Sequence, residues 1–127
     1  YSAAGTDALY CLGMCTADEN ADLLDPASWT KSEHPVFQSS RKNGQFGPGH
    51  NSFTKDEEGH DVMVYHARQE ERYLVDEGYQ PLYDAGRNAT LMRIYWNEDG
   101  TPNFSVPIPS GKGHDIPTEF TAKVIVK

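Results

Sequence analysis

Residues 47–66 decide the fold, and they read GPGHNSFTKDEEGHDVMVYH. Residues 51–54 and 61–66 carry the β-branched and aromatic side chains typical of strands, and residues 56–59, DEEG, form a polar turn that ends in glycine. We therefore predict an antiparallel hairpin here. The glycines and the proline of residues 39–50 predict a loop with unusual backbone angles in front of it.

Two further hairpins flank this one. Residues 1–3 and 9–16, YSA and LYCLGMCT, are joined by the turn GTD and predict a hairpin with buried strands. Residues 90–96 and 103–107, TLMRIYW and NFSVP, are joined by a tight polar turn and predict the other hairpin.

The segments between the hairpins are shorter and more polar. Asp25 and Pro26 suit the N-cap and the first position of one helical turn, with Trp29 packing beneath it. Residues 34–37, HPVF, predict a short strand whose proline favours an edge position. Residues 70–84 predict a surface loop.

The fold class follows from these many short strands. Residues 107–117 are predicted to be a linker, and residues 120–126 a last alternating strand. A chain of 127 residues with 11 glycines, 8 prolines and 7 tyrosines has the turn-rich, aromatic composition of an all-β protein. The strand spacing suits a sandwich, a barrel or a propeller, and composition does not choose among them.

Charge and cysteine usage limit the partners and the compartment. The formal net charge of -8 disfavours nucleic acid and anionic lipid, and no apolar run approaches the ~20 residues that span a bilayer. Cys11 and Cys15 are four residues apart, too far along one strand to form a disulfide, and we interpret them as two small buried thiols. Two unpaired cysteines and the lack of a signal-peptide pattern favour a cytoplasmic location.

Four stretches carry a family resemblance when taken together and in order. They are residues 21–29, ADLLDPASW; residues 47–53, GPGHNSF; residues 64–68, VYHAR; and residues 86–102, which contain GR, IYW and DGTP. These stretches resemble the last two blades of glycoside hydrolase family 43, especially its bacterial α-N-arabinofuranosidase and β-xylosidase branch.

The resemblance implies part of a five-bladed β-propeller, about two blades plus a terminal strand. Residues 1–107 would be the C-terminal blades, and residues 108–127 a linker and the terminal strand. A blade takes ~40–50 residues, so this chain cannot close such a ring alone.

The resemblance also implies that the catalytic carboxylates lie outside this chain. Inverting glycosidases use a carboxylic acid and a carboxylate base ~6.5–9.5 Å apart. In family 43 the base, an aspartate that tunes the acid and the glutamate acid all lie upstream of the position matching Tyr1. We therefore predict no catalytic residue here, and we interpret Asp18, Glu19 and Asp22 as a solvated acidic face.

His50 and Arg87 are the predicted binding residues. The family resemblance implies that His50 points into the central channel, close to substrate and to a calcium ion, which it would contact through the ion's water shell because calcium prefers oxygen ligands. The alternative for His50 is a buried histidine bonded to the loop backbone. Arg87 matches the position whose guanidinium reaches the sugar at the cleavage subsite, and the alternative is a surface arginine.

The remaining motif residues are expected to be structural. His66 and Arg68 are interpreted as structural or rim residues, and Arg93 as a packing or salt-bridge residue. Trp29 and Trp96 could stack on sugar rings, but their alternating neighbours favour packing between blades.

The sequence is compatible with two functions, one as part of an enzyme and one as a binding module. The first is the C-terminal portion of an enzyme that hydrolyses arabinofuranosyl or xylosyl linkages with inversion; this chain would be inactive without its N-terminal blades. The second is a non-catalytic carbohydrate-binding module in which a second copy of the chain completes a ring. Both predict an arabinose- or xylose-containing oligosaccharide as ligand.

Overall fold

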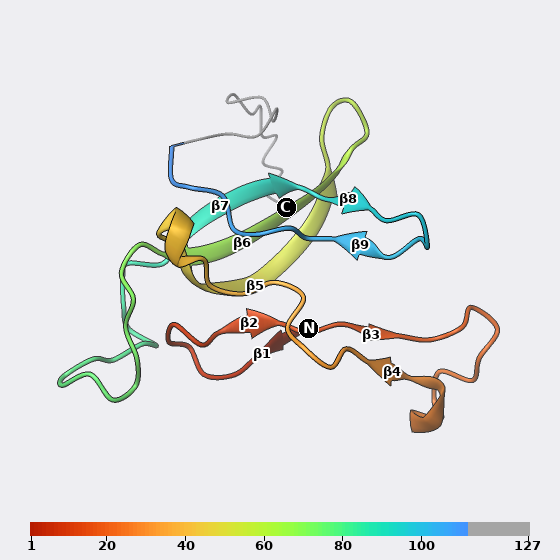
Figure 1. The fold of residues 1–127 in the computed structure, drawn as a ribbon, viewed down its shortest axis with the longest axis horizontal. Coiled ribbons are helices and arrows are strands. Elements are labelled where there is room, and N and C mark those ends of the chain that lie inside the picture. Colours follow the sequence, from red (N-terminus) through yellow and green to blue (C-terminus); the bar gives the residue numbers. More distant parts are fainter. Residues whose placement is uncertain (112–127) are drawn as a thin grey trace, which may run out of the picture.

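The computed structural model describes residues 1–111 as an all-β arrangement of four small antiparallel sheets (Figure 1). The strands are β1 (Ser2–Ala3), β2 (Cys11–Leu12), β3 (Cys15–Thr16), β4 (Thr30–Lys31), β5 (Phe46–Lys55), β6 (Asp61–Arg68), β7 (Asn88–Arg93), β8 (Tyr95–Trp96) and β9 (Pro102–Asn103). Two short 3-10 turns, η1 (Pro26–Ser28) and η2 (Arg41–Asn43), complete the regular structure. The predicted strand at residues 120–126 lies outside the described residues.

The central sheet has the strand order β5-β6-β7 and contains the predicted hairpin. Lys55 pairs with Asp61 at its closed end, where Gly59 has a φ of 86° and completes the turn. In Figure 1 this sheet lies above β1 and β2, and the hairpins β3-β4 and β8-β9 project to the same side of the molecule. The loop between β6 and β7 projects to the opposite side.

The Gly-Pro-Gly stretch belongs to β5, so the predicted loop over residues 39–50 is wrong in its second half. The register of β5 against β6 shifts twice before Ser52, which accommodates the two glycines as bulges. Gly47 has a φ of 58°, and its N–H donates to Ser39 Oγ over 2.8 Å. A Cβ atom at Gly47 would overlap the carbonyl oxygen of Asp7, which explains why glycine occupies this position.

The core lies between the central sheet and β2. Met63 and Tyr65 from β6 and Met92 from β7 pack with Leu12 and Phe37 in one buried cluster. The rings of Phe37 and Tyr65 meet edge to face, with centroids 4.9 Å apart. These contacts join the first 40 residues to the central sheet, although the sheets share no strand.

The outer hairpins and the helix cap were predicted correctly, whereas the short strand at residues 34–37 and the burial of both cysteines were not. β1 pairs with β2 and β8 with β9, as predicted, and Asp25 Oδ1 accepts the Ala27 N–H over 2.9 Å as the N-cap of η1. Residues 34–37 form no strand of their own, because only Phe37 bridges to Leu12. Cys11 is buried but Cys15 is exposed, which corrects the expectation of two buried thiols; both are free.

The two tryptophans lie near the surface of residues 1–111. Trp29 is 44% exposed and Trp96 is 59% exposed within the described part of the chain. Each indole N–H has a nearby acceptor, the Leu23 carbonyl for Trp29 and Asp61 Oδ2 for Trp96. Their packing between blades stays a prediction, because this part of the chain exposes the faces on which a neighbouring blade would lie.

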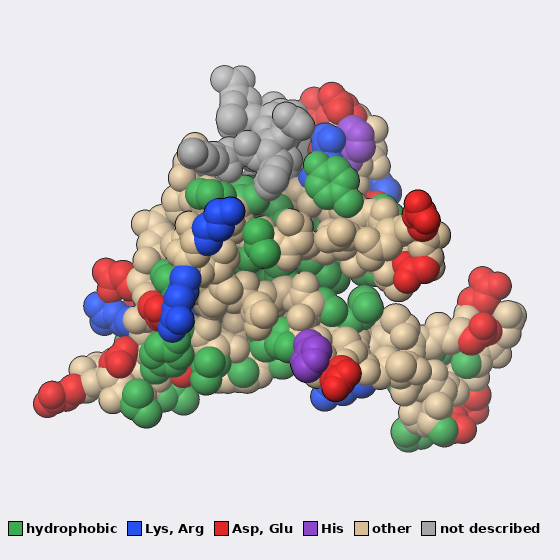
Figure 2. Space-filling model, viewed as in Figure 1, with side chains coloured by type: hydrophobic (Ala, Val, Ile, Leu, Met, Phe, Trp, Pro, Cys, Tyr) green, Lys and Arg blue, Asp and Glu red, His purple; other side chains and the backbone are tan. Residues whose placement is uncertain are grey.

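The surface carries its acids at loop ends. On the face in Figure 2, acidic side chains lie mainly at the tips of the projecting loops. Asp18 and Asp22 are exposed and accept hydrogen bonds from backbone N–H groups two residues further on, as expected for a solvated acidic segment. No helix among residues 1–111 is long and apolar enough to cross a membrane.

Candidate functional site

The predicted site residues lie at one end of the central sheet. His50 follows the bulges of β5, His66 lies near the end of β6, and Arg87 directly precedes β7. Because β6 pairs with both neighbours and Gly49 lies opposite His66, the sheet register brings these segments together. The opposite end of the sheet holds the turn between β5 and β6.

His50 presents its side chain at the surface in an unusual backbone conformation. Its φ is 47°, a left-handed value that is uncommon for residues other than glycine, and its N–H donates to Ser2 Oγ over 3.0 Å. This bond ties the end of the Gly-Pro-Gly bulge to β1. The alternative of a buried histidine is wrong, because His50 is exposed.

His66 is the centre of the cluster, although the sequence indicated only a structural or rim role. Its ring stacks on Tyr10 with centroids 5.4 Å apart and an interplanar angle of 11°, and it meets the His50 ring edge on at 6.3 Å. Tyr10 comes this close because it lies over Gly49, where a Cβ atom would overlap the phenol ring. The pairing of Gly49 with His66 brings this ring into the cluster, and the sequence alone does not reveal that register.

The surroundings keep His66 neutral at physiological pH. Burial lowers the pKa of His66 to about 4, and the nearby charges of Arg87, Arg68 and His50 act in the same direction. A hydrogen bond to the backbone of Gly47 opposes this shift. The buried Nε2 atom of His66 has no hydrogen-bond partner among the described residues.

Arg87 is half-buried and leans on its own loop. Its Nη2 donates to the carbonyl oxygen of Leu82 over 2.8 Å. Among the charged groups, Arg87 lowers the pKa of His66 most, and His50 lowers it as well. Both predicted binding residues, His50 and Arg87, are therefore near the same imidazole. The cluster offers a cation, a neutral acceptor and an exposed imidazole, which together suit a neutral polyhydroxyl ligand.

Next to Arg87, the loop between β6 and β7 encloses a polar hollow of about 280 Å³. Its lining includes Arg68, Arg72, Asp84 and Asn88. Arg68 pairs with Asp84, so this hollow contains a buried ion pair in addition to exposed polar groups. Arg93, by contrast, forms the predicted salt bridge, with Asp56 at 3.3 Å.

The described residues give a calcium ion at His50 only a partial ligand set. Among residues 1–111, the group of three possible metal ligands lies elsewhere, at Asp56, Glu58 and His60 in the turn between β5 and β6. Arg93 already occupies that turn, 3.3 Å from Asp56 and 3.8 Å from Glu58. An ion near His50 would therefore present a water molecule to the imidazole and take its direct oxygen ligands from elsewhere.

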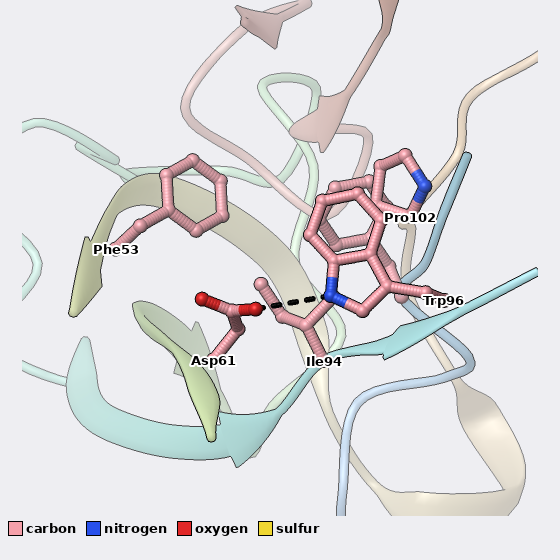
Figure 3. A pocket seen from close by; sticks show the side chains of 6 residues that line it. Phe53, Asp61, Ile94, Trp96 and Pro102 are labelled. Atoms are coloured by element: carbon pink, nitrogen blue, oxygen red, sulfur yellow. Dashed lines mark hydrogen bonds between the residues drawn. The ribbon is translucent and has the colours of Figure 1, made fainter. Parts of the chain in front are cut away.

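A second hollow, of about 320 Å³, lies at the other end of the sheet (Figure 3). It is lined by Phe53, Asp61, Ile94, Trp96, Pro102 and Phe104. Asp61 accepts the Trp96 N–H over 3.0 Å and pairs with Lys55 at 2.8 Å, so its carboxylate is already engaged. This hollow is separate from the His50, His66 and Arg87 cluster.

Comparison with known proteins gives a consistent family. Residues 1–102 match the sequence profile of glycosyl hydrolases family 43. The chain is 54% identical over 112 residues to an extracellular exo-α-(1→5)-L-arabinofuranosidase of Streptomyces avermitilis, and 53% identical over 112 residues to α-L-arabinofuranosidase B of Pyricularia oryzae. It covers 22% of the length of each of these relatives.

A solved structure agrees with the sequence comparison. The crystal structure of α-L-arabinofuranosidase from Lactobacillus brevis is 52% identical and superposes with a TM-score of 0.80. The match covers 88% of this chain and 34% of the solved one.

The expectation of a cytoplasmic location is wrong. The Streptomyces avermitilis relative is named as an extracellular enzyme, which points to secretion. The cysteines misled the prediction because burial protects one of them: the pKa of the Cys11 thiol is raised by desolvation, which makes that thiol unreactive. The N-terminal pattern carried no information either, since the chain spans a minor part of these relatives.

Proposed function

Since this chain belongs to glycosyl hydrolases family 43, we propose that it is the C-terminal portion of an enzyme that hydrolyses α-L-arabinofuranosyl linkages. The observation that carries this proposal is the identity of 52–54% to three proteins named α-L-arabinofuranosidases, over a segment that contains the His50, His66 and Arg87 cluster. These names favour arabinose over xylose as the sugar that is released.

The complete enzyme would be a five-bladed β-propeller, of which residues 1–111 supply about two blades. Two features support this view. The sheets β1-β2, β3-β4 and β8-β9 have two strands each, and two-stranded sheets need further packing to be stable. The match also covers 34% of the solved relative, which leaves the remaining blades to the rest of the polypeptide.

The acid and the base of the reaction would come from those other blades. A general acid for glycoside cleavage needs a carboxyl group whose pKa is raised. The carboxyl groups with shifted pKa values in residues 1–111 are all shifted downward, because each accepts hydrogen bonds; they are Asp56, Asp61, Glu71, Asp84 and Asp99. This supports a binding role for the described residues.

Arg87 would bind the arabinofuranosyl unit. Its guanidinium can donate hydrogen bonds to neighbouring sugar hydroxyls. The lowered pKa of His66, about 4, keeps the neighbouring imidazole uncharged at neutral pH. His50 would contact the sugar or, through water, a calcium ion in the central channel, which supplies positive charge there.

The extracellular location named for the Streptomyces avermitilis relative is proposed for this chain as well. The exposed surface is compatible with it, because acidic side chains lie at the loop tips and the cysteine pair contains one buried thiol.

The proposal is tested by kinetics of the full-length polypeptide that contains this chain. We expect cleavage of an aryl α-L-arabinofuranoside and little cleavage of the matching β-D-xyloside. Arg87→Ala is expected to lower kcat/KM by about 10- to 100-fold, because a charge-assisted bond to substrate is lost. Arg41→Ala is the matched control, since Arg41 is an exposed arginine that pairs with Glu71 and belongs to no part of the cluster. Equal activities of the two variants would refute the role of Arg87.

A further inference from the structure

A buried ion pair joins the end of β6 to the loop in front of β7. Arg68 is the last residue of β6, and its side chain is 2% exposed. Its Nε donates to Asp84 Oδ2 over 2.8 Å, and its Nη2 donates to the Pro81 carbonyl over 2.9 Å. Because a guanidinium removed from water needs an anion and acceptors nearby, these bonds hold the loop against the sheet.

The second oxygen of Asp84 acts on the backbone next to Arg87. Asp84 Oδ1 accepts the Gly86 N–H over 2.7 Å. A Cβ atom at residue 86 would lie 3.0 Å from this oxygen, so glycine permits the close approach. One carboxylate therefore binds both the Arg68 guanidinium and the peptide group that leads into Arg87.

The same loop fixes the Arg87 side chain. Arg87 Nη2 donates to the Leu82 carbonyl, which lies between Pro81 and Asp84. Asn88 Nδ2 donates to the Gly86 carbonyl over 3.0 Å, so the chain remains bonded as it enters β7. Displacing Asp84 from Arg68 would remove the link between the buried guanidinium and the Gly86 amide, which directly precedes Arg87.

We propose that Asp84 is a positioning residue that acts through Arg87. Its carboxylate links the buried Arg68 to the Gly86 amide and so holds the Arg87 guanidinium beside His66. This inference rests on the proposed function, in which Arg87 binds the arabinofuranosyl unit. Asp84 itself touches no reacting atom in this account.

The test is a double-mutant cycle in the full-length polypeptide. Asp84→Asn keeps the shape of the side chain and removes its charge. We expect this change to lower kcat/KM for an aryl α-L-arabinofuranoside by about tenfold, and to change it by less than about twofold when Arg87→Ala is already present. Asp76→Asn is the control, because exposed Asp76 accepts the Tyr73 N–H in the same loop without an arginine partner.

A merely structural role gives a different pattern. If Asp84→Asn lowers kcat/KM equally with and without Arg87, the effect does not pass through Arg87 and the proposal is overturned. Hydrogen exchange of the Gly86 amide separates this failure from a failure of the proposed function. Faster exchange of the Gly86 amide in Asp84→Asn than in Asp76→Asn would support the link from Asp84 to the backbone before Arg87. If kcat/KM is nevertheless unchanged in Arg87→Ala, the link stands and the substrate role of Arg87 is refuted. Unchanged exchange would overturn the link itself.

Discussion

The imidazole of His66 lies face to face with the phenol ring of Tyr10, with centroids 5.4 Å apart and 11° between the ring planes. Burial removes water from the imidazole, and Arg87 and Arg68 supply positive charge near it. Both effects disfavour an imidazolium ion and lower the pKa of His66. His66 is therefore a neutral acceptor in a positively charged surrounding.

Stability is expected to fall as His66 is forced to take up a proton. Its pKa is about 4 in the folded protein and 6.5 ordinarily, so between these values the unfolded chain binds a proton that the folded chain does not. The contribution is complete above pH 6.5 and is lost as the pH falls toward 4. Urea unfolding at pH 7, 5.5 and 4 should show a smaller decline for His66→Gln than for the wild type. Parallel declines would contradict the lowered pKa.

Loss of the buried arginine is expected to be costly. Arg68→Met leaves the Pro81 carbonyl and one oxygen of the partly buried Asp84 carboxylate without their donor, and losing a charged hydrogen bond of this kind costs about 2 kcal/mol of unfolding free energy. Arg41→Met should change stability little, because the Arg41 side chain is 76% exposed in its pair with Glu71. Denaturant unfolding measures the free energy of unfolding of both variants. Similar losses would show that burial of Arg68 does not make its ion pair more stabilising than the exposed pair of Arg41.

Alanine substitutions at Gly47 and Gly44 distinguish the cost of a left-handed backbone from the cost of a steric overlap. Their φ values are 58° and 61°, but a Cβ atom at Gly47 would overlap the Asp7 carbonyl, whereas nothing lies within 4 Å of one at Gly44. Gly44→Ala should cost about 1 kcal/mol from its left-handed backbone alone, and Gly47→Ala about 3 kcal/mol or more. Unfolding free energies measure both. Equal costs would mean that the bulge moves away from Asp7 without penalty.

Calcium should stabilise the full-length enzyme through His50. We expect added calcium to raise the midpoint of thermal unfolding over that in a chelator, and to raise it less in His50→Ala. His34→Ala is the control, because His34 is another exposed histidine, outside the cluster. An equal calcium response in all three proteins would place the ion away from His50.

Local sequence predicted those elements that depend on local chemistry. The turn at residues 56–59 and the Asp25 cap follow from turn and capping preferences, and both were found. The Gly-Pro-Gly stretch was taken for a loop because glycine and proline usually interrupt strands. It lies in β5 because Ser39 Oγ accepts the Gly47 N–H and the Asp7 carbonyl, distant in sequence, leaves room there only for glycine.

The candidate site was predictable only where a family motif named the residue. His50 and Arg87 were predicted in this way, whereas Tyr10, His66 and Asp84 depend on register and on contacts across many residues. The Arg68 to Asp84 pair spans 16 residues through an irregular loop, and no periodic pattern indicates it.

In the proposed enzyme this chain supplies substrate-binding residues while the catalytic carboxylates lie elsewhere in the polypeptide. Release of arabinose from an aryl α-L-arabinofuranoside tests this division when residues 1–127 alone are compared with the full-length polypeptide. We expect hydrolysis by the full-length protein, with the inverted sugar seen first by proton NMR, and none by residues 1–127. Hydrolysis by residues 1–127 alone, or none by the full-length protein, would refute this division of roles.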